Sequence, residues 1–408
     1  MNKRESFTNR LGFILACIGS AVGMGNISGV ATSIAVGGPG AVFWMWIIAF
    51  FGMATIYGEA VLAQTFKTKD ETGHVIGGPV YYIRQAFKGT FGKILAGFFA
   101  LAIIFALGFT GNMVQSNSIG DAFHNAFGMS HLAVGIVVAV IAAFIFLGGV
   151  QRLAAVTEKL VPIMAGVFLL GGLAILVCRI KYVPATFGMI FKYAFQPQAI
   201  IGGGIGYALK TAISQGAKRG LFSNEAGMGS TPHAHAQANV AHAHDQGVVA
   251  MIGVFIDTFV VLTLNALVII CTLYTADGPL AGGYVGDVTS TLSKTNLAQT
   301  AFGSVMGASL GAKFVAICLF FFAFSTIIGW YFFGEQNIKY LFGTKGTTPY
   351  RLIVMGFIVL GSVLQVDLVW ELADMFNGLM VLPNLIALIG LSKIVSMALR
   401  DYDANNPR

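Results

Sequence analysis

Apolar segments long enough to cross a lipid bilayer recur along the 408-residue chain, and this pattern restricts the chain to one kind of fold. A membrane-spanning helix needs about 17–25 predominantly apolar residues. Ten segments fit, at residues 11–36, 41–66, 94–118, 132–150, 161–179, 198–217, 247–275, 311–334, 352–370 and 375–397. Because backbone polar groups must be satisfied internally in lipid, we predict an all-α polytopic membrane protein, with a single transmembrane domain over residues 1–408.

Composition excludes the other classes. Charged residues make up 10% of the chain and hydrophobic residues 56%, whereas soluble domains carry about 25% charged residues. The four cysteines lie in or beside apolar segments, which disfavours both a disulfide framework and a metal motif. They are Cys17, Cys178, Cys271 and Cys318. The first segment is too long for the apolar region of a signal peptide, so we predict a retained helix at 11–36.

The positions of lysine and arginine predict the orientation. With ten spans and the N-terminus inside, 19 of the 24 basic residues fall on the cytoplasmic side, as the positive-inside rule requires. The exceptions are Arg179, Lys181, Lys192, Lys294 and Lys313. We therefore predict a multi-pass protein of the plasma (inner) membrane with both termini cytoplasmic. This topology accounts for the net charge of +7 without a nucleic-acid partner.

Two glycine clusters occupy matching places in the two halves of the chain, 11–180 and 198–397. The first span of each half carries one, at Gly19–Asn26 and Gly202–Gly206. Each glycine destabilises a helix interior by about 1 kcal/mol relative to alanine, so both helices are expected to be interrupted. Paired interrupted helices point to the binding site of a secondary transporter. The alternative is close helix packing through small residues.

Several motifs resemble those of the alanine or glycine:cation symporter family. The longest runs from Arg219 to Ala236 and reads RGLFSNEAGMGSTPHAHA. Supporting motifs occur at 25–31 (GNISGVA), 37–46 (GGPGAVFWMW), 77–83 (GGPVYYI), 254–258 (VFIDT) and 324–330 (FSTIIGW). The resemblance extends over essentially the whole chain.

This resemblance implies a leucine-transporter-type fold. That fold has ten helices in two inverted five-helix repeats, 11–180 and 198–397, with helices 1 and 6 broken. It also implies sodium-driven uptake of alanine or glycine, including D-alanine in some members. Sodium would be the coupling ion, and no cofactor is expected. No nucleotide-binding or hydrolytic motif stands in a suitable context, so we predict that the chain is not an enzyme.

The first span also resembles the neurotransmitter:sodium symporters, at residues 10–13 and 19–26. In that family the carbonyls matching Gly19 and Val22 help to bind one sodium ion. The carbonyl matching Ala21 and the side chain matching Asn26 serve a second sodium ion beside the substrate. This similarity makes that family's substrate range the alternative to alanine and glycine.

Hydroxyl groups in span 8 complete the predicted cation site. Ser325 and Thr326 offer the oxygen ligands that a hard cation prefers. Their alternative role is a hydrogen bond back to the preceding helical turn. Trp330, one turn further on, is predicted to wall the substrate pocket, or else to lie in an interfacial aromatic belt.

The predicted substrate site lies between the two interrupted helices. Met24, Gly25 and Asn26 are the helix 1 candidates, and the amides of the latter two are expected to bind the substrate carboxylate. Gly203 and Gly204 are expected to offer carbonyls for its ammonium group. Half-helix ends and unwound carbonyls serve these purposes in secondary transporters.

Further polar residues within the spans are weaker candidates. Tyr207 is expected to neighbour the substrate, and Gln115, with Asn112, to face inward. Buried amides also act as interhelical contacts without further function. Glu59 and Asp257 are ionisable groups inside spans and are therefore candidates for a functional role.

A histidine cluster lies next to the longest motif. Its members are His233, His235, His242 and His244. Apart from Asp245, no cysteine or acidic ligand has suitable spacing for a metal site, so sodium is the only metal we predict. A cytoplasmic gate is the favoured role, in which Asn224 and Glu225 cap helix ends or pair with Arg219.

Taken together, the sequence predicts sodium-coupled symport of small neutral amino acids by alternating access. Proton coupling and a neurotransmitter-symporter-like substrate range remain the alternatives within transporters. A passive channel and a membrane enzyme that uses the histidine loop are the alternatives from other classes.

Overall fold

The computed structural model describes residues 23–70, 73–196, 205–275, 278–281, 292 and 294–405. The regular secondary structure in these residues is helical except for one short antiparallel hairpin. Its strands β1 (Thr68–Lys69) and β2 (Val75–Ile76) pair Thr68 with Ile76.

The first half contains a run of helices that ends before residue 197. They are η1 (Met24–Asn26), α2 (Ser28–Gly37), α3 (Ala41–Thr65), α4 (Pro79–Ala86), α5 (Gly89–Ile103), η2 (Ile104–Gly111), α6 (Asn112–Phe127), α7 (His131–Phe146), α8 (Gly149–Cys178), η3 (Ile180–Tyr182) and α9 (Val183–Phe195).

The second half is also helical. Its elements are α10 (Ile205–Asn224), α11 (Pro232–His235), α12 (Ala243–Phe255), η4 (Ile256–Leu262), α13 (Thr263–Ile269), η5 (Ile270–Tyr274), α14 (Lys294–Met306), α15 (Ala308–Phe342), η6 (Thr344–Gly346), α16 (Thr347–Val363), α17 (Val366–Gly390) and α18 (Ser392–Asn405).

Several of these helices are suited to a bilayer. Among the described residues, six are long and apolar enough to cross one, and a pair bent by 80° at Arg179 makes up to seven. The six are Ala41–Thr65, Gly89–Phe127, Ala243–Tyr274, Ala308–Phe342, Thr344–Val363 and Asp367–Gly390. Large apolar side chains point outward, including Leu170 (71% exposed) and Ile389 (76% exposed). Lipid is the solvent that such a surface requires, so the chain is a multi-pass membrane protein.

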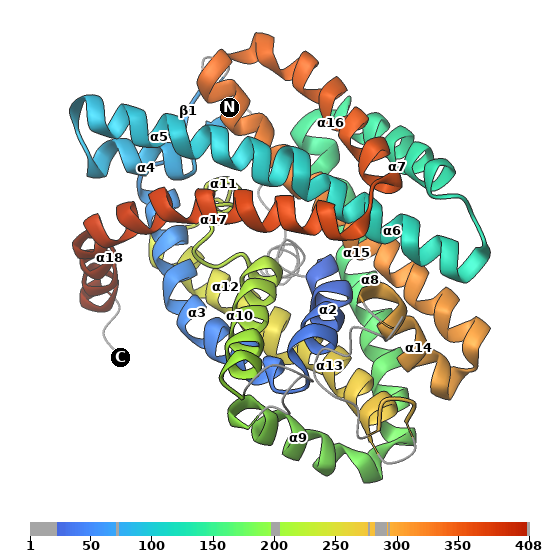
Figure 1. Ribbon diagram of the computed structural model, residues 1–408. Helices are drawn as coiled ribbons and strands as arrows, with labels where there is room; N and C mark the ends of the chain where they lie inside the picture. The colour runs from blue at the N-terminus through green and yellow to red at the C-terminus, as the bar shows by residue number, and fades with distance from the viewer. Residues whose placement is uncertain are drawn as a thin grey trace.

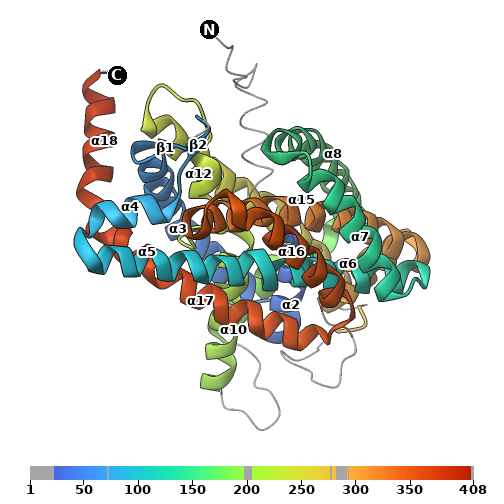
Figure 2. The same cartoon turned by 90° about the horizontal axis from the view of Figure 1, so that it is seen from above.

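One continuous helix of 39 residues, Gly89–Phe127, crosses the molecule. It consists of α5, η2 and α6, and α17 runs alongside it across the fold (Figure 1). Figure 2 shows the same two helices side by side, with α10 and α3 behind them and α18 at one edge. The π-helical turns of η2 lie in the middle of this helix, and such turns often mark functional sites.

Some predicted span boundaries differ from the structure. The last two spans were expected at 352–370 and 375–397, but α16 ends at Val363 and α17 begins at Val366. Leu364 and Gln365 have extended backbone, which ends one helix and starts the next. The acidic residues Asp367, Glu371 and Asp374 lower the hydropathy of the first half of α17, and this displaced the predicted segment.

Two non-α-helical segments in the described part of the chain, called the two interruptions below, lie close together. The first is Gly23–Ile27, where a single 3₁₀ turn leads into α2. The second follows α10, where residues 225–231 are not helical. The sequence placed this second interruption at Gly202–Gly206; residues 202–204 lie outside the described part, while Ile205 and Gly206 begin α10. The structure therefore has a non-helical segment inside the long family-like motif, and the interruption predicted at 202–204 stays a prediction.

The geometry of the second interruption explains its position. Backbone φ is positive at Glu225 (56°), Gly227 (87°) and Gly229 (79°). Glycine adopts such conformations readily, and alternating them prevents a helix from continuing.

Candidate functional site

A small cavity lies where the two interruptions meet. It is lined by Gly23, Met24, Gly25, Gln115, Phe222, Ser223, Glu225, Thr326 and Trp330. These residues come from η1, α6, the end of α10 and α15. The cavity has a volume of about 10 Å³, which is room for about one water molecule.

Missing side chains on helix 1 permit this close approach. A Cβ atom on Gly25 would lie 2.7 Å from the Cα of Ser223, and one on Gly23 would lie 2.5 Å from Thr326 Oγ1. A Cβ atom essentially never lies that close to a non-bonded heavy atom, so alanine at either position would displace its neighbour. The two glycines therefore bring helix 1 against α10 on one side and against α15 on the other.

Gln115 contributes an unpaired amide to the cavity wall. Its side chain is completely buried, and neither Oε1 nor Nε2 has a hydrogen-bond partner among the described residues. A buried polar group without a partner costs about 1–3 kcal/mol. Gln115 lies one turn beyond η2, whose Gly111 is so close to the ring of Trp330 that a Cβ would lie 2.5 Å from it. The unpartnered amide of Gln115 is therefore a candidate group for binding a polar ligand.

Glu225 faces the same cavity. Its Oε1 accepts a hydrogen bond from Trp330 Nε1 at 2.6 Å, and its Oε2 accepts one from Ser230 Oγ at 2.5 Å. Trp330 meets Phe222 edge to face at 5.3 Å. The wall of the cavity therefore combines an indole, a phenyl ring and a carboxylate.

A buried polar network supports the cavity from behind. Asn26 Nδ2 donates to Asp257 Oδ1 at 2.8 Å, and Ser223 Oγ donates to both carboxylate oxygens of Asp257 at 3.1 Å. Asn265 Nδ2 donates to the carbonyl oxygens of Asn26 and Ile27. Carbonyls freed by the first interruption are thereby satisfied, and η1, α10 and η4 are held together.

A second carboxylate fixes the other interruption. Glu59 on α3 is completely buried and accepts hydrogen bonds from the backbone N–H groups of Gly227 and Gly229, at 3.0 and 2.8 Å. Asn384 Nδ2 on α17 also donates to Glu59, at 2.6 Å, and to the carbonyl of Gly227. Glu59 therefore ties the non-helical segment to α3 and α17 and does not line the cavity.

The predicted site residues divide into three groups. Met24, Gly25, Gln115, Thr326 and Trp330 line the cavity. Others lie elsewhere: Asn26 lies behind the cavity, the Ser325 hydroxyl donates to Phe322 O, and Tyr207 is 58% exposed on α10. Gly19, Ala21, Val22, Gly203 and Gly204 lie outside the described residues.

Sequence reasoning missed three lining residues. They are Phe222, Ser223 and Glu225, all in the motif at 219–236. The motif was used to identify a resemblance, while the binding site was assigned to the glycine cluster before it. A run of small and polar residues with spaced glycines (SNEAGMGS) was the signal that could have located the interruption.

The histidine cluster has structural contacts. His233 Nδ1 is 2.8 Å from Ser230 O and its Nε2 is 2.8 Å from Asn337 Nδ2, and its ring stacks against Phe99. His244 stacks on Tyr402 of α18 at 4.0 Å. Within the described ranges, no group of three or more His, Cys, Asp or Glu residues is placed to hold a metal.

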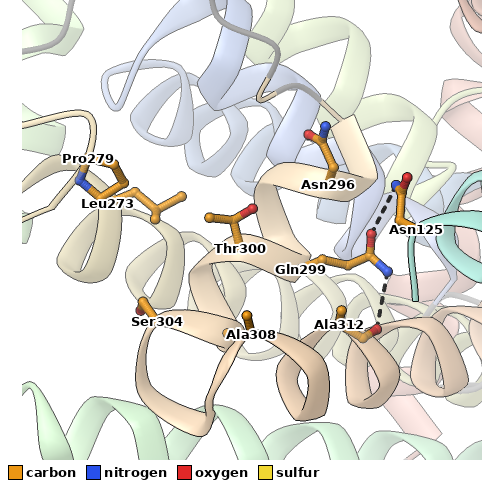
Figure 3. A pocket seen from close by; sticks show the side chains of 10 residues that line it. Asn125, Leu273, Pro279, Asn296, Gln299, Thr300, Ser304, Ala308 and Ala312 are labelled. Carbon is orange, nitrogen blue, oxygen red and sulfur yellow. Dashed lines mark hydrogen bonds between the residues drawn. The ribbon is translucent and has the colours of Figure 1, made fainter. Parts of the chain in front are cut away.

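A larger hollow lies at the far end of α6. Its volume is about 360 Å³, and it is bordered by α14 and the start of α15. Figure 3 shows Gln299 at its centre, hydrogen-bonded to Asn125 and to the carbonyl of Ala312. Gln299 Nε2 donates to Ala122 O as well. Because the polar groups of Gln299 are already partnered, this hollow is the weaker candidate despite its size.

The fold matches that of solved transporters. A crystal structure of MhsT in complex with L-phenylalanine superposes with a TM-score of 0.64, covering 97% of this chain and 99% of that one at 15% sequence identity. The similarity shows a leucine-transporter fold. Two non-helical segments that meet at a buried cavity are the arrangement expected of a secondary transporter.

Sequence comparison gives the family. A model of the sodium:alanine symporter family matches residues 2–408, and the chain belongs to that family. The sodium/alanine symporter AgcS of Methanococcus maripaludis is 42% identical over 94% of this chain and 81% of its own length. A probable sodium/glutamine symporter, GlnT of Bacillus subtilis, is 41% identical over 95% of this chain and 77% of its own length.

Proposed function

We propose that this protein couples the inward movement of sodium to the uptake of a small neutral amino acid, alanine or glycine. The observation that carries the proposal is the buried, unpartnered amide of Gln115 in a cavity between two interrupted helices. Such an amide is stabilised when a polar ligand supplies its missing hydrogen bonds. Ligand binding would then favour the closed arrangement of the helices around it.

The size of the cavity supports a small substrate. Trp330, Phe222 and Met24 help to enclose a space of about 10 Å³, so the walls must separate to admit any amino acid, least for glycine or alanine and much more for glutamine. The relatives' names include both alanine and glutamine. We therefore place alanine and glycine ahead of glutamine, with glutamine as the substrate that would require Phe222 and Trp330 to separate.

The proposed cation site lies between helix 1 and α15. The Thr326 hydroxyl is close enough to the backbone at Gly23 that a Cβ there would meet it at 2.5 Å. Carbonyls at Gly19, Ala21 and Val22, with the hydroxyls of Ser325 and Thr326, are the proposed oxygen ligands. In this structure the Thr326 and Ser325 hydroxyls donate to Phe322 O. A hydroxyl oxygen that donates its hydrogen in this way still has lone pairs that can coordinate a cation.

Asn26 has a different proposed role. Its Nδ2 donates to Asp257, and its Oδ1 accepts from the N–H of Gly23 at 2.9 Å. Direct binding of a cation would require Oδ1 to leave that N–H group. We therefore propose that Asn26 positions the interruption of helix 1 relative to Asp257.

The proposed topology follows from the sequence. Ten membrane spans would be arranged as two inverted repeats, 11–180 and 198–397, with both termini cytoplasmic. Lys210, Lys218 and Arg219 were counted as cytoplasmic, but they belong to α10, before the second interruption. The orientation therefore rests on the remaining basic residues, and labelling of single cysteines introduced at residues 70 and 129 from either side of the membrane tests it.

Uptake into proteoliposomes tests the function. Purified protein is reconstituted, and labelled alanine, glycine and glutamine are supplied with an inward sodium gradient or an inward proton gradient. We expect concentrative uptake of alanine and glycine with sodium alone. Uptake that only equilibrates would indicate a channel, and accumulation driven only by protons would contradict sodium coupling.

A further inference from the structure

We infer that the carboxylate of Glu225 binds the ammonium group of the transported amino acid. This inference rests on the proposed function and adds to it the residue that recognises the positive end of the substrate. Glu225 lines the cavity and is only 4% exposed. The sequence interpretation had given it a capping role or a pairing with Arg219.

Arg219 is not available to Glu225. Its guanidinium makes two hydrogen bonds to the carboxylate of Asp374 on α17, at 3.0 and 2.8 Å, and lies 4.2 Å from the ring of Trp370. Among the described residues, no basic side chain lies within 4.0 Å of the Glu225 carboxylate. A buried carboxylate without a cation is energetically costly. A positively charged ligand bound beside Glu225 would reduce this cost.

The backbone at Glu225 aims this side chain into the cavity. Its N–H bonds to Leu221 O at 2.8 Å, which completes the last turn of α10, and its φ is 56°. That left-handed position at the end of a helix is usually glycine. Glutamate is less favourable than glycine in this backbone conformation, but it provides a side chain that accepts a hydrogen bond from Trp330 across the cavity.

The hydrogen bonds of Glu225 leave room for a ligand. Each oxygen accepts from a single neutral donor, Trp330 Nε1 or Ser230 Oγ. An ionised carboxylate can accept about four hydrogen bonds, so about two positions remain. An ammonium group offers three donors, and the negative end of the α10 dipole lies at the same point.

The other buried acids fit this role less well. Asp257 accepts from Asn26, Ser223 and Thr258, and Glu59 accepts from two backbone N–H groups and Asn384. Neither lines the cavity. Their donors hold helices together, whereas Glu225 is the acid that contacts the space itself.

The position of Gln115 completes the assignment. Gln115 lines the same cavity as Glu225 and comes from α6 rather than from α10. Its Nε2 can donate to the carboxylate of the substrate, while Glu225 accepts from the ammonium group. A zwitterion bound in this way would lie with its side chain toward Met24, Phe222 and Trp330.

The test compares L-alanine with L-lactate, in which a hydroxyl replaces the ammonium group. Binding to purified protein in sodium is measured by calorimetry for the wild type and for Glu225→Gln. The glutamine variant keeps both existing hydrogen bonds, because its Oε1 can accept from Trp330 and its Nε2 can donate to Ser230. We expect the alanine Kd to rise about 10- to 100-fold, with lactate binding weak in the wild type and little changed in the variant.

Glu335→Gln is the matched control. Glu335 is also buried, lies on α15 five residues beyond Trp330, and bonds to Tyr331 and Lys339 without lining the cavity. Its alanine Kd should stay within about twofold of the wild type. The sodium concentration for half-maximal alanine binding should also be unchanged in Glu225→Gln, because the inference gives Glu225 to the ammonium group and not to sodium.

Three results would overturn the inference. The first is an unchanged alanine Kd in a folded Glu225→Gln protein. The second is a shift in sodium dependence without a shift in the preference for alanine over lactate. The third needs no variant: wild-type protein that binds L-lactate as tightly as L-alanine has no acceptor specific for ammonium. If the wild type instead binds neither alanine nor glycine, the proposed function itself fails.

Discussion

Two hollows among the described residues differ in a way that favours one of them as the proposed binding site. The hollow at the end of α6 holds about 360 Å³, and the cavity between the interruptions about 10 Å³. Each has a buried glutamine on its wall. Gln299 has hydrogen-bond partners for both ends of its amide, while Gln115 has none among the described residues.

For a transporter that closes around its substrate, the volume of a hollow is a poor guide to whether the hollow is the binding site. A closed site is small by construction, because the walls that must contact the substrate also contact each other. What remains visible is the chemistry left unsatisfied, an amide with no partner and a carboxylate with no cation. The larger hollow lacks both signs.

Replacing Gly25 by alanine should have the largest effect. Its Cβ would lie 2.7 Å from backbone Cα of Ser223, which cannot turn aside as a flexible side chain does. We expect at least a 100-fold loss of sodium-driven alanine uptake, measured in proteoliposomes. Gly29→Ala on α2 is the control, because a Cβ there meets nothing within 4 Å; equal activity of the two variants would contradict the close approach.

Exchanging the two glutamines for leucine tests the comparison directly. Gln115→Leu should weaken alanine binding about 10-fold or more and raise the free energy of unfolding, because a buried unpaired amide is removed. Gln299→Leu should lower the free energy of unfolding by about 1–3 kcal/mol, since its bonds to Ala122 and Ala312 are lost. It should leave the alanine Kd within twofold. Calorimetry and thermal unfolding in detergent measure both quantities.

The same result in both variants would remove the distinction between the hollows. If Gln115→Leu destabilised the protein and left binding intact, its amide would have a structural partner and the small cavity would lose its main support.

A smaller effect is expected for Thr326→Ala. The variant removes one proposed ligand of the cation, so the sodium concentration for half-maximal uptake should rise about 10-fold while the protein still inserts. Ser362→Ala on α16 is the control, because the Ser362 hydroxyl likewise bonds back to the preceding turn, at Val359 O, and does not line the cavity. Unchanged sodium activation in Thr326→Ala would exclude Thr326 from the cation site.

The sequence was most informative where the signal was either long or local. Long apolar segments predicted a multi-pass helical protein, and the motif at 219–236 predicted the family. Met24, Gly25 and Gln115 could be selected from local glycine content and polarity, and the structure places them around one cavity.

What could not be predicted depends on contacts between distant segments. Glu225 was assigned to capping because its neighbours in sequence suggested it, whereas Trp330, 105 residues away, is what fixes its carboxylate. The clamp of Glu59 on Gly227 and Gly229 joins residues about 170 positions apart. Likewise, the second interruption depends on left-handed backbone at Glu225, Gly227 and Gly229, and glycine count alone favoured Gly202–Gly206.

The smallest effect is expected from filling the larger hollow. Ala308 lies on its wall at the start of α15 and is exposed, so leucine there would occupy part of the 360 Å³ without breaking a hydrogen bond. If the hollow has no part in binding, the alanine Kd measured by calorimetry stays within twofold of the wild type, and so does the rate of uptake. A slower rate with an unchanged Kd would place the hollow on the path of the substrate, and a raised Kd would make it part of the site. Because Gln299 already has its partners, neither change should occur.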